Sequence, residues 1–273
     1  MNRRLGLFLQ WTKHHHDISF FEILKKVLEP TCSVKAQKLI ANINEEGEYR
    51  EIHFKNMVRP FYFPQALPLR LLFQFVAELM FKDSWHYYEI PETTVSKDDI
   101  VVDCGAAEGI FGYLTSQRCK HVYAIEPMPL FIKSMMKTFQ NDANVTIIPA
   151  VLSNETGKVY CSETDHSLYF SSNKTDHYQQ EIPVATIDAL FFEKDIPVTY
   201  LKLDVEGYEL KVLQGAKQSI KTYRPTVVCA TYHEQNIANE LIDFLKGIHP
   251  DYKIIMKGIE NVEGKYVLLH AYL

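Results

Sequence analysis

The sequence lacks an apolar run long enough to cross a membrane. A bilayer-spanning helix needs about 20 mainly apolar residues, and the stretch LPLRLLFQFVAELMF at 67–81 is shorter than that. Arg70, Gln74 and Glu78 interrupt it at a spacing of four, which predicts a helix with one polar stripe. The opening MNRRLGLFLQW has two arginines before an apolar stretch, but no small-residue cleavage site follows. We therefore expect neither a transmembrane segment nor a signal peptide.

Cysteine pairs of the C-x-x-C kind are also missing. The three histidines at 14–16 are not spaced with any cysteine as zinc ligands would be. The cysteines are Cys32, Cys104, Cys119, Cys161 and Cys229. The simplest interpretation is a reduced protein located in the cytoplasm.

No stripe of positive charge runs through the sequence. The 29 lysines and arginines are scattered, and the 34 acidic residues outnumber them to give a net charge of −5. Proteins that bind nucleic acid usually present a basic patch to the phosphates. A nucleic-acid partner is therefore not expected.

A regular alternation of strand and helix patterns begins near Ile100. We divide the chain into an N-terminal elaboration, residues 1–95, whose role the sequence leaves unknown, and a domain over residues 96–273. Strand patterns lie at 100–104, 121–126, 145–152, 199–205 and 226–233. Helix patterns begin near 110, 129 and 237, and another extends over about 210–224. The alternation predicts an α/β fold with parallel strands joined by right-handed crossovers.

Two segments of the second part do not follow this alternation. Residues 153–183 are rich in Ser, Thr, Asn, Asp and His and predict a hairpin plus a loop. The last two strand patterns, 252–258 and 266–273, flank a turn that contains Asn261 and Gly264. They predict a C-terminal antiparallel hairpin.

Three glycines follow the first strand in VVDCGAAEGIFGYL, residues 101–114. A strand, a glycine turn and a helix N-terminus together favour a nucleotide-like ligand. The spacing of Gly105, Gly109 and Gly112 is not the G-x-G-x-x-G of dinucleotide sites. Asp103, just before the turn, would repel a pyrophosphate and attract a cation or an amino group. S-adenosylmethionine combines an adenosine with an amino acid and a sulfonium, and it fits this pattern.

Glu126 ends the second strand, 23 residues after Asp103. A carboxylate in this register can accept hydrogen bonds from both ribose hydroxyls of a bound nucleotide. This acid fits a nicotinamide cofactor as well as S-adenosylmethionine, and a solvated loop carboxylate is the simpler alternative.

Four blocks of the sequence resemble successive motifs of the FkbM-type class I methyltransferases. They are VVDCGAAEGIFGYL, VYAIEPMP, AVLSNETGKV and TYLKLDVEGYELKVLQGA. The resemblance covers about residues 97–255 and is most specific in the last block. It implies a Rossmann-like, mostly parallel seven-stranded sheet with helices on both faces. It also implies S-adenosylmethionine-dependent O-methylation, often of sugar hydroxyls in secondary metabolites, glycolipids or surface polysaccharides.

The resemblance also indicates which residues would contact the cofactor. Ala106, Ala107 and Glu108 depart from the family's usual turn, so contacts to the methionine end are expected to differ in detail. The expected cofactor residues are Asp103, Gly105, Ala106, Ala107, Gly109, Phe111, Glu126, Pro127, Val151, Leu152, Ser153 and Asp204.

Charged residues gather at the end of the strand in TYLKLDVEGYEL. Strand alternation would place Lys202, Asp204 and Glu206 on one face, beside the cofactor. Burying such groups is unfavourable unless they pair or bind a ligand. In the alternative interpretation these charges are structural. Lys202 would form an ion pair with a carboxylate, and Glu206 and Glu209 would be acids that stabilise a helix N-terminus.

Tyr232-His233-Glu234 stands at the end of the next strand and is similar to a family block. An alcohol is a poor nucleophile until it loses its proton, and a histidine of near-neutral pKa is a suitable base. A hydrogen-bonded loop histidine is the competing interpretation. The expected catalytic residues are His233, Asp204 and Glu206.

The acceptor is expected to be an oxygen. The Asn/Asp-Pro-Pro-Tyr/Phe turn of amino methyltransferases is missing at Asp204-Val205-Glu206-Gly207. A carbohydrate hydroxyl is the acceptor that the resemblance favours, and the Ser/Thr/His-rich segment 162–177 could cover it or be a solvated loop. The carboxylates of Asp204, Glu206 and Glu209 could bind a divalent cation, but the same groups could instead bind sugar hydroxyls. We assign no metal ligand.

Two other functions stay open from the sequence. A nicotinamide-dependent oxidoreductase would use the same fold, although the G-x-G-x-x-G turn is missing. A non-catalytic protein could keep the cofactor fold without turnover.

The N-terminal stretches MNRRLGLFLQW and ISFFEILKKVL are apolar and partly basic, which allows peripheral contact with a membrane. The sequence leaves the oligomeric state open.

Overall fold

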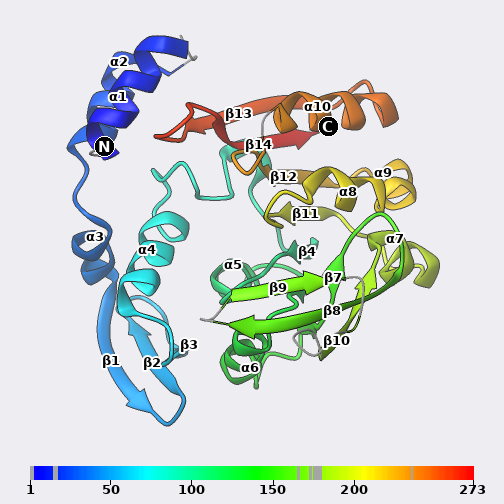
Figure 1. The fold of residues 1–273 in the computed structure, drawn as a ribbon, viewed down its shortest axis with the longest axis horizontal. Helices are drawn as coiled ribbons and strands as arrows, with labels where there is room; N and C mark the ends of the chain where they lie inside the picture. The colour runs from blue at the N-terminus through cyan, green and yellow to red at the C-terminus, as the bar shows by residue number, and fades with distance from the viewer. Residues whose placement is uncertain (1–2, 15–17, 165–166, 172–173, 175–179, 235) are drawn as a thin grey trace.

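Parallel strands form the centre of the domain, as the alternating pattern predicts. The computed structural model describes residues 3–14, 18–164, 167–171, 174, 180–234 and 236–273 (Figure 1). The seven-stranded sheet has the strand order β13-β14-β12-β11-β4-β5-β6. Its strands are β4 (Ile100–Cys104), β5 (His121–Ile125), β6 (Val145–Ile148), β11 (Tyr200–Leu203), β12 (Thr226–Ala230), β13 (Lys253–Ile259) and β14 (Tyr266–Tyr272).

The pairing of these strands confirms the predicted sheet. The five strands from β12 to β6 are mutually parallel. β14 lies antiparallel to β12, and β13 pairs antiparallel with β14, so the predicted C-terminal hairpin forms one edge of the sheet. The chain runs outward from β4 to β6 and then returns to β11 and β12. β4 and β11 therefore flank the point where the strand order reverses, which is where ligands bind in open α/β sheets.

Helices cover both faces of the sheet because strand side chains alternate in direction. They are α5 (Ile110–Thr115), α6 (Pro129–Thr138), α7 (Ile187–Leu190), the 3₁₀ turn η2 (Phe192–Lys194), α8 (Glu209–Gln214), α9 (Lys217–Tyr223) and α10 (Ile237–Ile248). Val102 and Leu203 belong to a core shared with α8, α9 and α10. Val101 and Tyr200 face the opposite way and pack with residues of the N-terminal elaboration.

The N-terminal elaboration lies along one side of the domain (Figure 1). It comprises α1 (Arg3–His14), α2 (Phe20–Leu28), α3 (Cys32–Leu39), β1 (Ile40–Glu46), β2 (Tyr49–Phe54), β3 (Phe61–Pro64), α4 (Leu69–Leu79) and the 3₁₀ turn η1 (Pro91–Thr93). The first three strands form their own antiparallel sheet. In α4, Leu72 and Val76 are fully buried while Gln74 is exposed, which confirms the amphipathic helix. The two parts of the chain share buried clusters, and the division at residue 95 stays a prediction.

The strand expected over 145–152 was wrong as a single element. β6 ends at Ile148, and β7 (Val151–Leu152) belongs to a second sheet of order β7-β10-β8-β9. Pro149 stands between them, and proline cannot donate a ladder hydrogen bond. The predicted hairpin after it is confirmed as β8 (Gly157–Thr164) with β9 (Ser167–Ser171), and β10 (Gln180–Ala185) adds a strand that the pattern did not show.

The helix expected over 210–224 was also wrong as a single element, because it is divided into α8 and α9. The carbonyl of Gly215 accepts a hydrogen bond from Asp188 N at 2.9 Å. The Asp188 carboxylate in turn accepts from the backbone N–H groups of Gln218 and Ser219, at 2.9 and 2.8 Å. A side-chain acceptor at unpaired N–H groups stabilises a helix start. Asp188 therefore caps α9 as a separate helix.

Among the described residues, no helix is both long and apolar enough to cross a bilayer.

Candidate functional site

The carboxyl ends of β4 and β11 bring two predicted site segments into contact. Leu203 pairs with Cys104 in the sheet, and Asp204 N donates to Cys104 O at 3.0 Å. The glycine turn after β4 therefore lies directly beside the acidic segment after β11. The sequence predicted that the acids would lie beside the cofactor turn, but β11 ends at Leu203, so strand alternation does not place Asp204 and Glu206.

The glycines of the turn are required by the backbone itself. Gly105 and Gly109 have φ of +73° and +88°, in the region that favours glycine. A Cβ on Gly105 would overlap the carbonyl oxygen of Asp204, and one on Gly109 would be 2.8 Å from the side chain of Met135. Close packing therefore explains these two glycines without a ligand, and the glycine spacing alone does not identify one.

Asp103 is fully buried and forms an ion pair within the protein. Its carboxylate lies 2.9 Å from Lys202 Nζ, which also donates to Gly105 O at 2.7 Å. Burial raises the pKa of Asp103, and the Lys202 charge opposes that rise. The two residues were expected to face the cofactor separately, whereas the structure pairs them. Attraction of a cationic ligand to Asp103 stays a prediction, with part of its charge already neutralised.

Two further buried carboxylates lie at the same turn. Burial raises the pKa of Glu108 to about 8 and that of Glu126 to about 7, while backbone hydrogen bonds oppose the rise. Glu126 accepts from Ala107 N at 2.9 Å and from Met128 N at 2.8 Å, so its position is fixed. Each of these acids is influenced by the charges of Asp103 and Lys202.

The charge balance of this turn shows which ligands suit it. Lys202 pairs with Asp103, while burial disfavours the charged forms of Glu108 and Glu126, whose pKa values are about 8 and about 7. A ligand with positive charge would favour the ionised forms of these two acids, whereas a pyrophosphate would oppose them. A sulfonium with an α-amino group therefore fits the turn better than a dinucleotide does.

The remaining expected cofactor residues differ in accessibility. Phe111 is buried, with its ring 5.5 Å from that of Tyr88 and 6.0 Å from that of Tyr200. Ala106 and Leu152 are buried as well. Partial exposure is found at Ala107, Pro127, Val151 and Ser153. The structure places all of them in the segments that the motifs indicated, and their contact with a cofactor stays a prediction.

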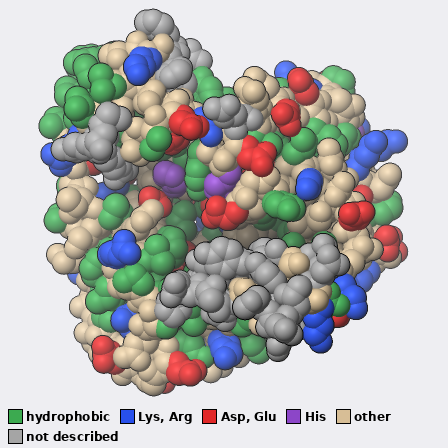
Figure 2. All heavy atoms as spheres, viewed as in Figure 1, with side chains coloured by type: hydrophobic (Ala, Val, Ile, Leu, Met, Phe, Trp, Pro, Cys, Tyr) green, Lys and Arg blue, Asp and Glu red, His purple; other side chains and the backbone are tan. Residues whose placement is uncertain are grey.

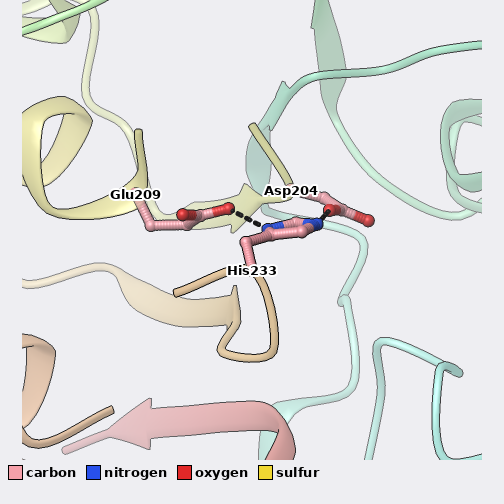
Figure 3. A group of neighbouring side chains, drawn as sticks. All are labelled: Asp204, Glu209 and His233. Atoms are coloured by element: carbon pink, nitrogen blue, oxygen red, sulfur yellow. Dashed lines mark hydrogen bonds and ion pairs between the residues drawn. The ribbon is translucent and has the colours of Figure 1, made fainter. Parts of the chain in front are cut away.

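His233 lies between two carboxylates just after β12 (Figure 3). Its Nδ1 is 2.7 Å from Glu209 Oε1, and its Nε2 is 3.4 Å from Asp204 Oδ1. Glu206 Oε2 is 3.5 Å from the same Nε2. The structure thus brings together the three residues expected to be catalytic. Their roles stay predictions.

Glu209 fixes the histidine and was not among the expected catalytic residues. It is fully buried, and its Oε1 also accepts from Val205 N at 3.2 Å and Gly207 N at 3.4 Å. Although burial acts to lower the pKa of His233, the hydrogen bond that its Nδ1 donates to Glu209 and the nearby carboxylate charges raise it overall. The position of Glu209 at the start of a helix was the available signal, but an acid there is common for electrostatic reasons alone.

Asp204 and Glu206 differ in how firmly they are held. The side chain of Asp204 is 22% exposed and that of Glu206 is 90% exposed. Tyr88 Oη donates a hydrogen bond to Asp204 Oδ2 from the N-terminal elaboration. No motif marked Tyr88, because the contact joins residues that are far apart in the sequence. Asp204 is therefore the better ordered of the two carboxylates.

Asp204, Glu209 and His233 could also approach a metal ion. One ligand atom from each lies within 4.8 Å of the others. A cation bound through His233 Nδ1 and Glu209 Oε1 would have to replace the hydrogen bond that joins them. We therefore treat the three residues as a hydrogen-bonded group.

The predicted acceptor-covering segment, 162–177, is described only in part, because residues 165–166, 172–173 and 175–177 lie outside the described residues. Its backbone is described in β8 and β9 and at residue 174.

Comparison with known proteins identifies related structures. A crystal structure of an FkbM methyltransferase from Methylobacillus flagellatus KT has 22% sequence identity and a TM-score of 0.52. The similarity covers 75% of this chain and 53% of that one, so this chain spans about half the length of that protein. This similarity supports the fold. No curated protein matches the sequence significantly.

Two weaker similarities concern other solved structures. Precorrin-6y C5,15-methyltransferase from Geobacter metallireducens GS-15 is 12% identical, with a TM-score of 0.42 over 67% of this chain and 85% of that one. Fibrillarin from Aeropyrum pernix, with natively bound S-adenosyl-L-methionine, is 11% identical, with a TM-score of 0.42 over 85% and 98%. Both are too distant to support an inference about this chain.

The model of the methyltransferase FkbM domain matches residues 103–253, more than half of the 273 residues. The match includes the glycine turn, the acids after β11, and His233. The chain belongs to the FkbM methyltransferase family.

Proposed function

We propose that the protein is an S-adenosylmethionine-dependent O-methyltransferase in which His233 is the general base. The observation that supports it is the position of the imidazole: buried Glu209 holds Nδ1, and Nε2 faces Asp204 beside the glycine turn. A carboxylate on Nδ1 favours the tautomer with its proton there, which leaves Nε2 free to accept a proton.

The cofactor would supply an electrophilic methyl group on a sulfonium. The turn after β4 would hold it, with Glu126 accepting from the ribose hydroxyls. In-line displacement depends mainly on alignment of the acceptor oxygen with the methyl group. His233 would remove the acceptor's proton, and the carboxylates of Glu209 and Asp204 would stabilise the imidazolium that forms.

The proposed acceptor is a carbohydrate hydroxyl. Asp204 and the exposed Glu206 place carboxylate oxygens near His233 Nε2, where they can accept hydrogen bonds from neighbouring hydroxyls of one sugar. Protein carboxylates are common partners of polyols because each has two strong acceptor oxygens.

We also propose that α1 and α2 contact an anionic membrane surface. Exposed apolar side chains follow helical spacing on both helices, at Leu5, Phe8 and Leu9 on α1 and at Phe21, Leu24 and Leu28 on α2. Rings link the two helices, since Trp11 lies 6.0 Å from Phe8 and 5.9 Å from Phe20. Figure 2 shows hydrophobic side chains gathered at this end of the molecule.

The charges on α1 and α2 favour an anionic membrane over a second copy of the chain as the partner that covers their apolar surface. α1 has no acidic residue, and the Glu22 carboxylate on α2 accepts a hydrogen bond from Trp85 Nε1 at 2.9 Å. Arg4 and Lys13 are exposed on α1, and exposed Lys25 on α2 lies 3.4 Å from Asp83 Oδ2, although the whole chain carries a net charge of −5. Apolar and basic side chains on one helical surface suit the interface of an anionic bilayer.

Cytoplasmic location remains a proposal. It is supported by the free thiols of Cys32, Cys104, Cys119 and Cys229, because reduced cysteines are typical of that compartment.

The proposed activity is tested in two steps. Calorimetry with S-adenosylhomocysteine and with NAD should show binding of the first and not of the second. Incubation with S-adenosylmethionine carrying a labelled methyl group should then transfer the label to a sugar. Binding without transfer to any acceptor would leave a non-catalytic cofactor-binding protein, and tighter binding of NAD would favour an oxidoreductase.

A further inference from the structure

A cavity of about 440 Å³ lies between the N-terminal elaboration and the domain. Its walls come from α2, α3 and α4, from residues 84–86, and from the turn between β13 and β14. This volume is within the range of about 300–1,000 Å³ that small-molecule sites occupy. The face of the molecule in Figure 2 is hollowed at its centre, and histidine and acidic side chains surround the hollow.

One end of the cavity is lined by Tyr232, the residue before the candidate base. Tyr232 lines the cavity, and its ring centroid is 4.3 Å from that of His233. His86, also in the lining, has its ring 5.5 Å from Tyr232. A molecule held in the cavity could therefore contact Tyr232, whose ring packs against that of His233.

The lining suits a ligand with hydroxyl groups. Gln74, Glu78, His86 and Asn261 offer amide, carboxylate and imidazole groups, which can donate and accept hydrogen bonds. Tyr232 adds an aromatic ring, against which the C–H face of a sugar can pack.

The two lysines of the cavity do not make it an anion site. Lys26 Nζ donates to Glu29 Oε1 at 2.6 Å and to the carbonyl of Asp83. Lys35 Nζ lies 3.6 Å from Glu29 Oε2 and 3.8 Å from Asp83 Oδ1. Both ammonium groups are thus neutralised within the protein. Glu78 adds a further carboxylate to the lining, which disfavours a phosphate or sulfate.

We propose that this cavity binds a neutral sugar unit of the acceptor, so that the N-terminal elaboration recognises the acceptor while the domain binds the cofactor. The inference rests on the proposed carbohydrate O-methylation. It assigns a role to residues 1–95, and it explains why Tyr88 and His86, from this part of the chain, lie beside Asp204 and Tyr232.

The test measures sugar binding without turnover. Saturation-transfer NMR would record a panel of methyl glycosides of neutral hexoses and deoxyhexoses with the full chain saturated in S-adenosylhomocysteine. His86→Ala and Glu78→Gln should each weaken binding of the best glycoside at least tenfold. Glu193→Gln, an exposed acid on η2, is the matched control and should leave sugar binding unchanged. S-adenosylhomocysteine affinity should be the same in all four proteins, and inorganic phosphate should not displace the glycoside.

Three results would overturn the proposal. The first is that no glycoside in the panel binds. The second is a bound glycoside with the same affinity in both cavity variants, which would place the sugar elsewhere. The third is displacement by inorganic phosphate, which would make the cavity an anion site. Methyl transfer to a sugar alongside any of these would leave the proposed function standing and remove only the cavity assignment.

Discussion

The ionisation state of His233 decides whether it can remove a proton. Because its pKa is raised above the ordinary 6.5, the imidazole stays protonated to a higher pH than a free histidine does. Turnover should therefore fall as the pH drops through a value above 6.5, and not through the ordinary pKa. His233→Ala should lower kcat by about 10²- to 10⁴-fold and remove this acid limb. Steady-state kinetics from pH 5.5 to 9 would measure both effects.

Glu209→Gln distinguishes a base held by a carboxylate from a base that acts alone. Loss of the Glu209 charge should lower the pKa of His233 and move the acid limb to lower pH, with a smaller loss of kcat than in His233→Ala. Glu193→Gln is the control for a change of surface charge. Near-normal turnover and an unchanged acid limb in His233→Ala would contradict the assignment and shift the role to Asp204 or Glu206.

Glu126 carries a second pH-dependent prediction. Its pKa is about 7 through burial, and only the ionised carboxylate can accept hydrogen bonds from both ribose hydroxyls. The Kd for S-adenosylhomocysteine should therefore decrease as the pH rises through about 7. Glu126→Gln should raise the Kd about tenfold or more and weaken this dependence, since hydrogen bonds to a charged group contribute about 1.5–3 kcal/mol each.

Calorimetry at several pH values measures the effect, with a melting curve of Glu126→Gln as the folding control. That control is needed because Glu126 also accepts hydrogen bonds from two backbone N–H groups. Equal affinity in a folded variant would mean that the ribose does not contact this residue.

The sequence indicated which residues gather at the site better than it indicated their partners. Asp204, Glu206 and His233 follow neighbouring parallel strands, so strand order alone brings them together. The pairing of Lys202 with Asp103 could not be assigned, because alternation gives the face of a side chain and not its contact. Tyr88 gave no signal, since only the folded N-terminal elaboration carries its hydroxyl to Asp204.

At the scale of elements, the pattern located strands and helices but not their interruptions. The periodicity of 145–152 continues across Pro149, yet the chain leaves one sheet for another there. The periodicity of 210–224 continues across Gly215, yet Asp188 caps a new helix after it. Both breaks depend on partners from β10 or α7 that local periodicity does not contain.

The exposed apolar surface of α1 and α2 gives a prediction about membranes. The double variant Phe21→Ser/Leu28→Ser should reduce flotation with vesicles of phosphatidylcholine and phosphatidylglycerol at least tenfold. The two side chains are 81% and 68% exposed, so their replacement should not disturb the core. Val58→Ser is the matched control, because Val58 is fully exposed but lies outside these helices.

The same flotation experiment distinguishes electrostatic binding to a membrane from self-association of the chain. Flotation of the wild type should weaken with added salt and with neutral vesicles. Failure of the wild type to float, together with a smaller oligomer in the double variant, would show that a second copy of the chain covers the surface instead.

At the scale of the whole molecule, two parts of the chain meet at one site. The domain contributes the glycine turn and His233, and the N-terminal elaboration contributes Tyr88 and most of a cavity that reaches Tyr232. Under the proposed function, such an arrangement would separate cofactor binding from acceptor recognition.

The most direct measurement is transfer of a labelled methyl group from S-adenosylmethionine to a glycan pool, detected by mass spectrometry and run with wild type and His233→Ala in parallel. We expect the wild type to place the label on a sugar oxygen. The variant should bind S-adenosylhomocysteine with unchanged affinity but transfer the label about 10²- to 10⁴-fold more slowly. Label found on a nitrogen, or no transfer to any sugar by a wild-type protein that binds S-adenosylhomocysteine, would contradict carbohydrate O-methylation.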